Sequence, residues 1–308
     1  MNARVLVLGE ALVDVVSMQG AEPVEHPGGS PLNVALGLAR LDHDASLATW
    51  FGRDERGLRL REVTESGGVT LVEGSDGAVA TPIALADVDA EGRASYTFEL
   101  EWRLPTLTSE ALAAYGHLHT GSFAATLAPG GNDVVAAIGE ARGHATVSYD
   151  PNARPALMGS ADAVRGRVTD LVAASDVVKV SDEDIAWLYP DTSEEEVIRA
   201  WAKSGPALVV VTRGPEPVRV MLATDGILRE VARPVIEVAD TVGAGDSFMA
   251  GLLSALLDAG FLGSAEAKAS LRAAGWDEVL PAIERGVATS GVTVGQAGAY
   301  APTRLEIT

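Results

Sequence analysis

Short, β-branched apolar runs alternate along the chain with Ala- and Leu-rich segments of helical length. Strands are predicted over residues 5–9, 46–50, 117–121, 146–149, 176–180 and 208–212. Helices are predicted between them, over residues 33–41, 55–66, 133–142, 162–174, 182–189 and 194–204, and then over 245–259, 265–274 and 278–290. Buried strands separated by helices are typical of a parallel sheet covered on both faces. The pattern therefore predicts one α/β domain over residues 1–308.

One stretch departs from this alternation. Residues 79–87 and 93–100 are two strand-like runs joined by a turn-rich segment that contains Gly92. Tyr96 and Phe98 are two residues apart in the second run, so both side chains point to the same face. The pattern predicts a hairpin, which is either a lid over a site or an edge hairpin without a function.

Composition narrows the class of protein. The 308 residues include 43 acidic and 23 basic side chains and no cysteine, and the formal net charge is −20. The lack of cysteine excludes disulfides, zinc–thiolate sites, iron–sulfur clusters and cysteine nucleophiles. An acidic surface repels nucleic-acid phosphates and anionic lipids, so neither nucleic acid nor a membrane is an expected partner. The N-terminus does not resemble a signal peptide, and no window approaches the apolar length of a membrane span, so we expect a cytoplasmic protein.

The sharpest chemical motif is the glycine-containing segment 240–248, which leads into an apolar helix. Gly243 and Gly245 permit backbone torsions and a close ligand approach that a β-carbon would hinder. The amides of Ala244, Gly245 and Asp246 would then lie unpaired at a helix N-terminus, where an anion is favoured. Asp246 could accept a proton from a hydroxyl group held beside that anion, or it could simply cap the helix.

Two other phosphate-binding motifs are absent from the sequence. No GxxxxGK(S/T) segment occurs, which excludes a P-loop NTPase. Residues 243–248 lack the third glycine of GxGxxG and lie far from the first βα turn, so the sequence does not support a Rossmann dinucleotide site.

A second motif, residues 26–35, is a glycine turn that runs into an amphipathic helix. The carboxamide of Asn33 can both donate to and accept from a sugar hydroxyl group. Asp14 follows the first predicted strand, and a carboxylate that accepts from two adjacent hydroxyl groups suits a polyol. Each of these residues is also compatible with ordinary turn or capping chemistry.

Together these motifs resemble the paired signatures of the ribokinase-like (pfkB) carbohydrate kinases. The first signature is Gly28-Gly29-x-x-x-Asn33, and the second is the segment 240–246 with its two glycines and Asp246. Residues 52–57 are similar to the family's GxDxxG turn, and residues 211–214 resemble its nucleotide-side loop. Residues 150–154 and 179–184 are most similar to bacterial fructokinases, and the likeness covers essentially the whole chain.

The resemblance implies a fold and an activity. The fold would be a doubly wound, mainly parallel sheet with helices on both faces, and a small β-sheet lid formed by parts of about residues 10–30 and 75–104. The activity would be phosphorylation of a sugar hydroxyl group with ATP and Mg²⁺, most similar to the conversion of fructose to fructose 6-phosphate. The alternatives are 2-keto-3-deoxygluconate kinase, another sugar kinase of the family, or a catalytically silent sugar- or nucleotide-binding protein. A homodimer through the lid is a further expectation.

The resemblance also implies roles for individual residues. Asp246 would be the general base, and the amides of Gly243, Ala244, Gly245 and Asp246 would form an anion hole. The residues implied for sugar binding are Asp14, Gly28, Gly29, Asn33, Tyr96, Phe98 and Arg154, the last facing either a substrate oxygen or a phosphate. The residues implied for nucleotide binding are Ser181, Thr212, Arg213 and Gly214. Asp184 would organise Mg²⁺ through water, and Asp240 would belong to a site for a monovalent cation such as K⁺.

Two segments depart from the family pattern, and one histidine pair needs separate consideration. Leu32 stands before Asn33 where many relatives have Ala, and Ser30-Pro31 is expected to stiffen the turn before the helix. Residues 181–184 replace the Asn-containing acidic motif of ribokinases, which leaves the Mg²⁺ role of Asp184 open. His117 and His119 share one strand face, but the sequence places no third ligand, so we expect packing rather than a metal site.

Overall fold

The computed structural model describes residues 3–18, 22–88 and 94–307. Its centre is a nine-stranded sheet in the order β13-β12-β11-β10-β9-β8-β1-β4-β5. The strands are β1 (Val5–Leu8), β4 (Ala45–Ala48), β5 (Thr70–Leu71), β8 (His117–Gly121), β9 (Thr146–Asp150), β10 (Val177–Ser181), β11 (Leu208–Arg213), β12 (Glu216–Leu222) and β13 (Leu228–Val231). Neighbouring strands from β5 to β11 pair in parallel, whereas β12 and β13 join antiparallel at one edge. The predicted doubly wound, mainly parallel sheet is confirmed.

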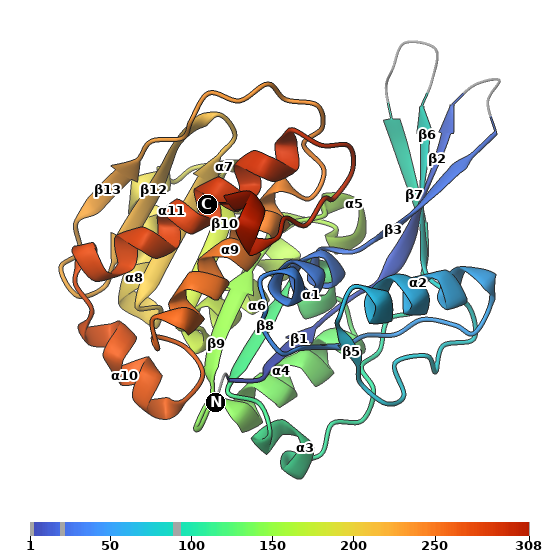
Figure 1. Cartoon of the computed structure of the whole chain (residues 1–308), viewed down its shortest axis with the longest axis horizontal. Helices are drawn as coiled ribbons and strands as arrows, with labels where there is room; N and C mark the ends of the chain where they lie inside the picture. Colours follow the sequence, from blue (N-terminus) through green and yellow to red (C-terminus); the bar gives the residue numbers. More distant parts are fainter. Residues whose placement is uncertain (1–2, 19–21, 89–93, 308) are drawn as a thin grey trace.

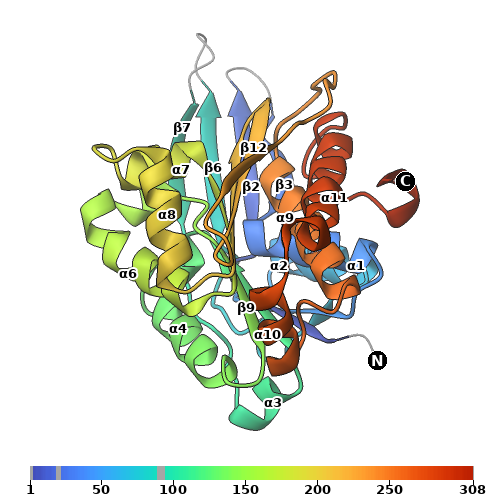
Figure 2. The ribbon, with the colours of Figure 1, turned by 90° about the vertical axis from the view of Figure 1, so that its left-hand side faces the viewer.

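Helices cover both faces of this sheet, as Figure 2 shows nearly edge-on. One face carries α1 (Ser30–Arg40), α9 (Ala244–Asp258), α10 (Ala265–Ala273) and α11 (Trp276–Val294). The other carries α4 (Gly130–Ala141), α6 (Ala161–Ala174), α7 (Asp182–Leu188) and α8 (Glu194–Ser204). The remaining helices are α2 (Glu55–Ser66) and the short α3 (Ser109–Ala113) and α5 (Pro155–Met158). No helix within the described ranges is both long and apolar enough for a membrane span.

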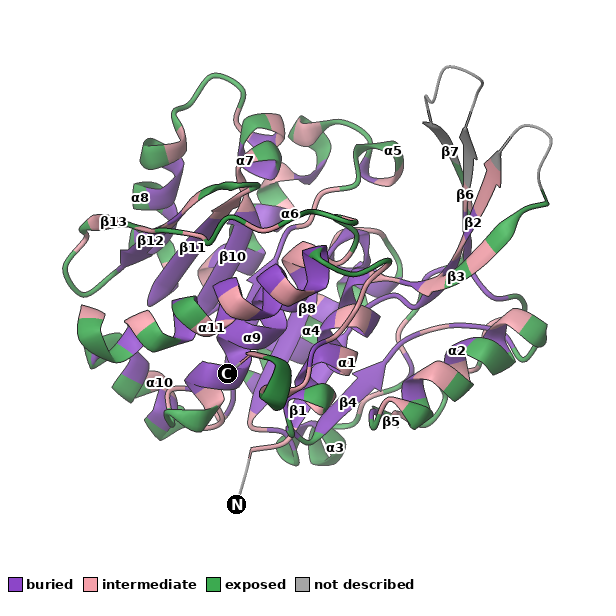
Figure 3. Cartoon of the chain, turned by 45° about the horizontal axis from the view of Figure 1, so that its top comes forward, coloured by how far each residue is buried: buried purple, intermediate pink, exposed green. Residues whose placement is uncertain are grey.

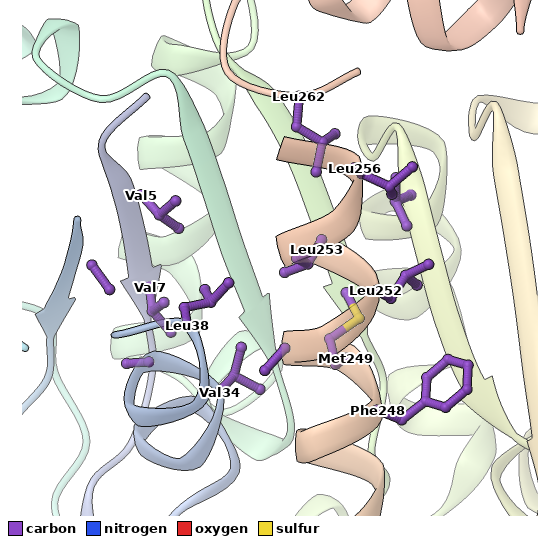
Figure 4. Packing of buried hydrophobic residues seen from close by; sticks show 14 of the residues in the cluster. Val5, Val7, Val34, Leu38, Phe248, Met249, Leu252, Leu253, Leu256 and Leu262 are labelled. Atoms are coloured by element: carbon purple, nitrogen blue, oxygen red, sulfur yellow. The ribbon is translucent and has the colours of Figure 1, made fainter. Parts of the chain in front are cut away.

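The central strand β1 is buried on both sides, which explains its continuous apolar run. Along β1, Val5 and Val7 enter one hydrophobic core, whereas Leu6 and Leu8 enter the other, and all four are fully buried. Figure 3 shows this buried sheet beneath the partly exposed outer surfaces of the helices. Figure 4 shows the first core, in which side chains of α1 and α9 pack beside Val5 and Val7. This packing brings α1 and α9 together above the sheet.

A separate four-stranded sheet extends from the main body (Figure 1). Its order is β3-β2-β6-β7, formed by β2 (Leu12–Met18), β3 (Val24–Gly28), β6 (Ile83–Val88) and β7 (Ala94–Glu99). β2 and β6 pair in parallel at the centre. β3 pairs antiparallel with β2, and β7 pairs antiparallel with β6, so these two strands form the outer edges. Two segments that are far apart in the sequence therefore form one small sheet, which joins the main body beside α1.

Two of the boundaries that differ from the predictions lie near the site. Helix α1 begins at Ser30, three residues before the predicted start, because Pro31 occupies its first turn, where the missing N–H has no helical role. The dipeptide Ser30-Pro31 thus begins the helix rather than stiffening a preceding turn. Strand β6 begins at Ile83 instead of residue 79, since the backbone amide of Thr81 is tied to Asp54 Oδ2 at 2.8 Å.

Candidate active site

A cavity of about 580 Å³ lies between the ends of β1 and β8, the first turns of α1 and α9, and the small sheet. Five residues predicted for the site from separate segments line it: Asp14, Asn33, Phe98, Arg154 and Asp246. Gly29, Gly243 and Gly245 line it as well. The position agrees with the rule that ligands of open α/β sheets bind beyond the carboxyl ends of the strands.

Asp246 lies in the first turn of α9 and is held there by helix α1. Ser30 Oγ donates to Asp246 Oδ1 at 2.7 Å, and Asn33 Nδ2 donates to Oδ2 at 2.8 Å. Asp246 is 7% exposed as a residue and lines the cavity. Each of its oxygens keeps a further lone pair, so the group can still accept a hydrogen bond from a ligand hydroxyl group.

The N-terminus of α9 presents backbone amides to the same cavity. Gly243 caps the helix in the left-handed conformation, with φ of 73°, and a β-carbon there would lie 2.7 Å from Ala299 Cβ. Within the described part of the chain, the amides of Gly245 and Asp246 have no hydrogen-bond acceptor. The prediction was wrong for Ala244, whose amide donates to Thr241 O at 3.2 Å and closes the turn. Two amides of the helix end therefore point outward, where an anion is favoured.

A buried ammonium group lies behind these amides. Lys179 Nζ would be 2.9 Å from a β-carbon placed on Gly245, and it donates to Asp150 Oδ2 at 2.7 Å. Both side chains of this ion pair are buried. Burial raises the pKa of Asp150 to about 6, although the charge of Lys179 opposes that rise. The ammonium end of this ion pair therefore lies close to Gly245 in the glycine turn.

The small sheet and the glycine pair contribute the opposite wall. Asp14 on β2 pairs in register with His26 on β3, and a β-carbon on Gly28 would lie 2.1 Å from Asp14 Oδ2. Gly29 has φ of 112° and lies so close to Glu10 that a β-carbon would be 2.5 Å from the Glu10 carbonyl oxygen. Burial raises the pKa of Asp14, whereas the nearby charge of Arg154 lowers it.

The aromatic and basic residues of the predicted site differ in how they are placed. Phe98 on β7 lines the cavity. Tyr96 pairs in register with Ala86, but its side chain lies outside the described residues. Arg154 also lines the cavity, and its Nη1 donates to Asn152 Oδ1 at 2.7 Å.

The four predicted nucleotide residues do not line this cavity. Ser181 and Thr212 are register partners at the carboxyl ends of β10 and β11, and Gly214 follows β11. The Ser181 hydroxyl accepts from the Asp184 amide at 3.0 Å and caps α7. Arg213 Nε lies 3.6 Å from Glu194 Oε2, so this guanidinium group is paired with the first turn of α8.

The two predicted metal residues are both tied to backbone amides. Asp184 Oδ1 accepts from Ala153 N at 2.8 Å, and the residue is 8% exposed. Asp240 accepts from Val242 N at 3.0 Å and Gly298 N at 2.9 Å, and these bonds lower its pKa. Among the described residues, no group of three or more His, Asp or Glu side chains is placed to hold a metal ion directly.

The paired histidines are buried and lie within hydrogen-bond distance of side chains on β9. His117 Nδ1 and Nε2 lie 2.8 and 2.9 Å from the hydroxyl oxygens of Thr146 and Ser148, and His119 Nδ1 lies 2.9 Å from Ser148 Oγ. Burial lowers the pKa of each ring to about 3, so both are neutral at pH 7.

Four polar residues of the site were not predicted from the sequence: Ser30, Lys179, Glu10 and Ser122. Ser30 and Glu10 stand inside or beside predicted motifs, but nothing local reveals that their side chains face the cavity. Lys179 gave the clearest signal, because it is a charged residue in an apolar strand. Such a residue is buried only with a partner.

The fold and this cavity define a class of protein, the α/β kinases of the ribokinase-like type. The chain matches the pfkB family carbohydrate kinase over residues 2–305. It is similar to the fructokinase of Klebsiella pneumoniae, with 33% identity over 264 residues that cover 83% of this chain and 85% of the relative. The chain therefore belongs to the pfkB family of carbohydrate kinases, as the resemblance predicted.

Two solved structures extend the comparison. The fructokinase of Xylella fastidiosa with bound ATP has a TM-score of 0.85 at 23% identity and covers 100% of this chain and 97% of its own; this likeness shows the fold. A double mutant of the fructokinase of Vibrio cholerae O395, with fructose, ADP and potassium ion bound, has a TM-score of 0.80 at 25% identity, and the match covers 100% of this chain and 98% of that one.

Proposed function

We propose that this carbohydrate kinase transfers the γ-phosphoryl group of ATP to fructose and forms fructose 6-phosphate. The observation that carries the proposal is the position of Asp246, whose carboxyl group lies in a cavity beside the outward-pointing amides of the α9 N-terminus. The names of the relatives support the choice of sugar, since fructokinases match in sequence and one related structure holds fructose and ADP.

In the proposed reaction, Asp246 is the general base. The carboxylate accepts the proton of the sugar hydroxyl group while the hydroxyl oxygen forms a bond to the γ-phosphorus. The bond from that phosphorus to the bridging oxygen breaks, and ADP leaves with the electron pair. A loose transition state of this kind asks the protein mainly for alignment and charge stabilisation. The amides of Gly245 and Asp246 and the buried ammonium group of Lys179 lie where they can supply that stabilisation.

The sugar would lie between the small sheet and α1. Asp14 and Asn33 would bind its hydroxyl groups, Gly28 and Gly29 would leave room for it, and Phe98 would exclude water. On this proposal residues 1–308 form one unit in which the small sheet is the lid. A homodimer through that lid and a cytoplasmic location stay predictions of the sequence.

The nucleotide would lie beyond the ends of β10 and β11, near Ser181, Thr212 and Gly214. Arg213 suits this role less, because Glu194 already pairs with its guanidinium group. Arg154 is exposed at the cavity and would face either the sugar or a phosphate.

The donor groups are compatible with two cations. Asp184 keeps one carboxylate oxygen beyond its bond to Ala153 N, which suits contact with Mg²⁺ through water. Bound Mg²⁺ would offset the charge of the phosphates. Both oxygens of Asp240 accept hydrogen bonds from backbone amides. Asp240 would therefore act mainly by ordering a loop, and the carbonyl groups of that loop would bind K⁺.

The sugar is tested by measuring ADP release with MgATP and fructose, ribose, 2-keto-3-deoxygluconate, fructose 1-phosphate or adenosine. We expect the highest kcat/KM with fructose, and NMR of the product should place the phosphate on the 6-hydroxyl group. A higher kcat/KM with another acceptor would replace fructose as the substrate. If no acceptor gave turnover above background, a sugar- or nucleotide-binding protein would be the better assignment.

The base is tested with Asp246→Asn. The amide cannot take the proton, so we expect kcat to fall at least ~100-fold while the fold and fructose binding are kept. Steady-state kinetics, thermal unfolding and equilibrium fructose binding measure the three quantities. Asp162→Asn, at an exposed position in the first turn of α6, is the matched control and should keep its activity. Near-normal kcat in Asp246→Asn would contradict the assignment of the base.

A further inference from the structure

Glu10 is a carboxyl side chain in the cavity wall that lacks a full set of partners. It follows β1, is 3% exposed and lines the cavity together with Asp14 and Asp246. Its Oε2 is buried and has no hydrogen-bond partner in the described part of the chain. A buried polar atom without a partner is costly. A ligand in the cavity is therefore a suitable source of the missing hydrogen bond.

Ser122 adds a second polar group beside Glu10. Its hydroxyl group acts on the Glu10 carboxyl group and lowers its pKa, and the residue is 1% exposed in the same cavity wall. Ser122 follows β8 with φ of 56°, a conformation that residues other than glycine rarely adopt. Backbone strain of this kind is concentrated at functional sites. Glu10 and Ser122 thus form one polar corner of the cavity, where the ends of neighbouring strands β1 and β8 meet.

We propose that this corner contacts the acceptor sugar, with Glu10 Oε2 hydrogen-bonded to one hydroxyl group, so that Glu10 helps to determine which hydroxyl pattern is accepted. The proposal rests on the proposed function, because it takes the cavity to be the sugar site. It gives Glu10 no part in the proton transfer, which belongs to Asp246.

The protonation state of Glu10 gives this contact its chemical character. Burial raises the pKa of Glu10 to about 8, so the group carries a proton at pH 7. The charged groups that act on it come from two other segments: Arg154 lowers this pKa and Asp246 raises it. A protonated carboxyl group can donate, whereas an ionised carboxylate only accepts. Glu10 therefore offers the sugar a hydrogen-bond donor from the cavity wall.

The contact is tested with fructose analogues that each lack one hydroxyl group. In the wild type, loss of the hydroxyl group that meets Glu10 should raise KM about 10-fold. Glu10→Ala should raise KM for fructose by a similar factor, and this variant should accept that analogue as well as it accepts fructose. If the effect of Glu10→Ala on KM simply multiplied the effect of every hydroxyl deletion, Glu10 would make no contact with the sugar. The proposal would then be overturned.

A pH profile provides a second readout. Raising the pH from about 7 to about 9 ionises Glu10 and removes its donor, so kcat/KM for fructose should fall with an apparent pKa near 8. Glu10→Gln keeps a donor and an acceptor at every pH, so it should stay within about 3-fold of the wild type at pH 7 and lack this fall. Identical profiles in the wild type and Glu10→Gln would contradict the proposal. Glu62→Gln, at an exposed position on α2, is the control and should keep the wild-type profile.

The outcomes separate this inference from the proposed function. If the wild type turned over no sugar, the proposed function would fail and this inference with it. If the wild type phosphorylated fructose but Glu10→Ala, folded by circular dichroism, bound fructose as tightly as the wild type, only the role of Glu10 would fail.

Discussion

At the scale of single residues, the catalytic carboxyl group that we propose is oriented by a helix other than its own. Ser30 Oγ and Asn33 Nδ2 donate to Asp246 from the first turn of α1, across 216 and 213 positions of sequence. Asn33 would also face the sugar, so its replacement would change binding and orientation together. Ser30 allows the orientation to be tested alone.

We therefore predict that Ser30→Ala lowers kcat about 10-fold and leaves KM for fructose within about 2-fold. A hydrogen bond to a charged group is worth ~1.5–3 kcal/mol, and part of that would hold the proposed base in its reactive direction. Steady-state kinetics measure both constants. Ser270→Ala removes an exposed hydroxyl group from α10 and should change neither. An unchanged kcat in Ser30→Ala would mean that Asn33 suffices to hold the base.

The same contacts show what the sequence could and could not predict about the site. Asp246, Asn33 and Asp14 were predictable because each stands in a motif whose spacing has a chemical meaning. The role of Ser30 was not predictable, because its hydrogen bond to Asp246 depends on the packing of α1 against α9 and not on neighbours in sequence. Glu10 could not be singled out for the same reason, because its burial depends on which strand ends surround it.

At the scale of elements, β1 and β11 were the most predictable strands, because they are buried on both faces and their sequences are mostly apolar. The pattern did not predict β12 and β13. β12 contains Pro217 and β13 has only four residues, two of them charged, so neither has the apolar run of a buried strand. They are stabilised by antiparallel pairing at the sheet edge, a tertiary interaction that local sequence does not encode.

Helix α9 holds the proposed base, and its close packing on α11 predicts opposite effects for one substitution at two helical glycines. A β-carbon on Gly251 would lie 2.3 Å from Thr289 Oγ1 and 2.8 Å from the Arg285 carbonyl oxygen. Gly251→Ala should therefore lower the free energy of unfolding by roughly 2 kcal/mol. Gly166 is exposed on α6 with open space around it, so Gly166→Ala should raise that free energy by about 0.5–1 kcal/mol.

Urea unfolding at one temperature and pH measures both changes, and the exposed variant is the control for the buried one. If Gly251→Ala were as stable as Gly166→Ala, α9 and α11 would be able to separate without cost. The close contact would then not fix the position of Asp246.

At the scale of the whole molecule, the net charge of −20 repels the nucleotide, which is also negatively charged. The proposed phosphate site offsets this locally through the helix end and Lys179, but these groups act only at short range. At an ionic strength of about 10 mM the screening length is roughly 30 Å, and at about 150 mM it is roughly 8 Å. Added salt therefore removes the long-range repulsion and preserves the local attraction.

We accordingly predict that kcat/KM for MgATP rises about 3-fold between these ionic strengths, because the approach of an anion to an acidic protein becomes less unfavourable. Fructose is neutral, so kcat/KM for fructose at saturating MgATP should change little and is the internal control. The salt should be tetramethylammonium chloride, with Mg²⁺ and K⁺ held constant, so that a specific cation effect does not enter. A fall in kcat/KM for MgATP with added salt would contradict the prediction. It would show that the positive groups around the glycine turn, rather than the net charge, dominate the field that the nucleotide meets on approach.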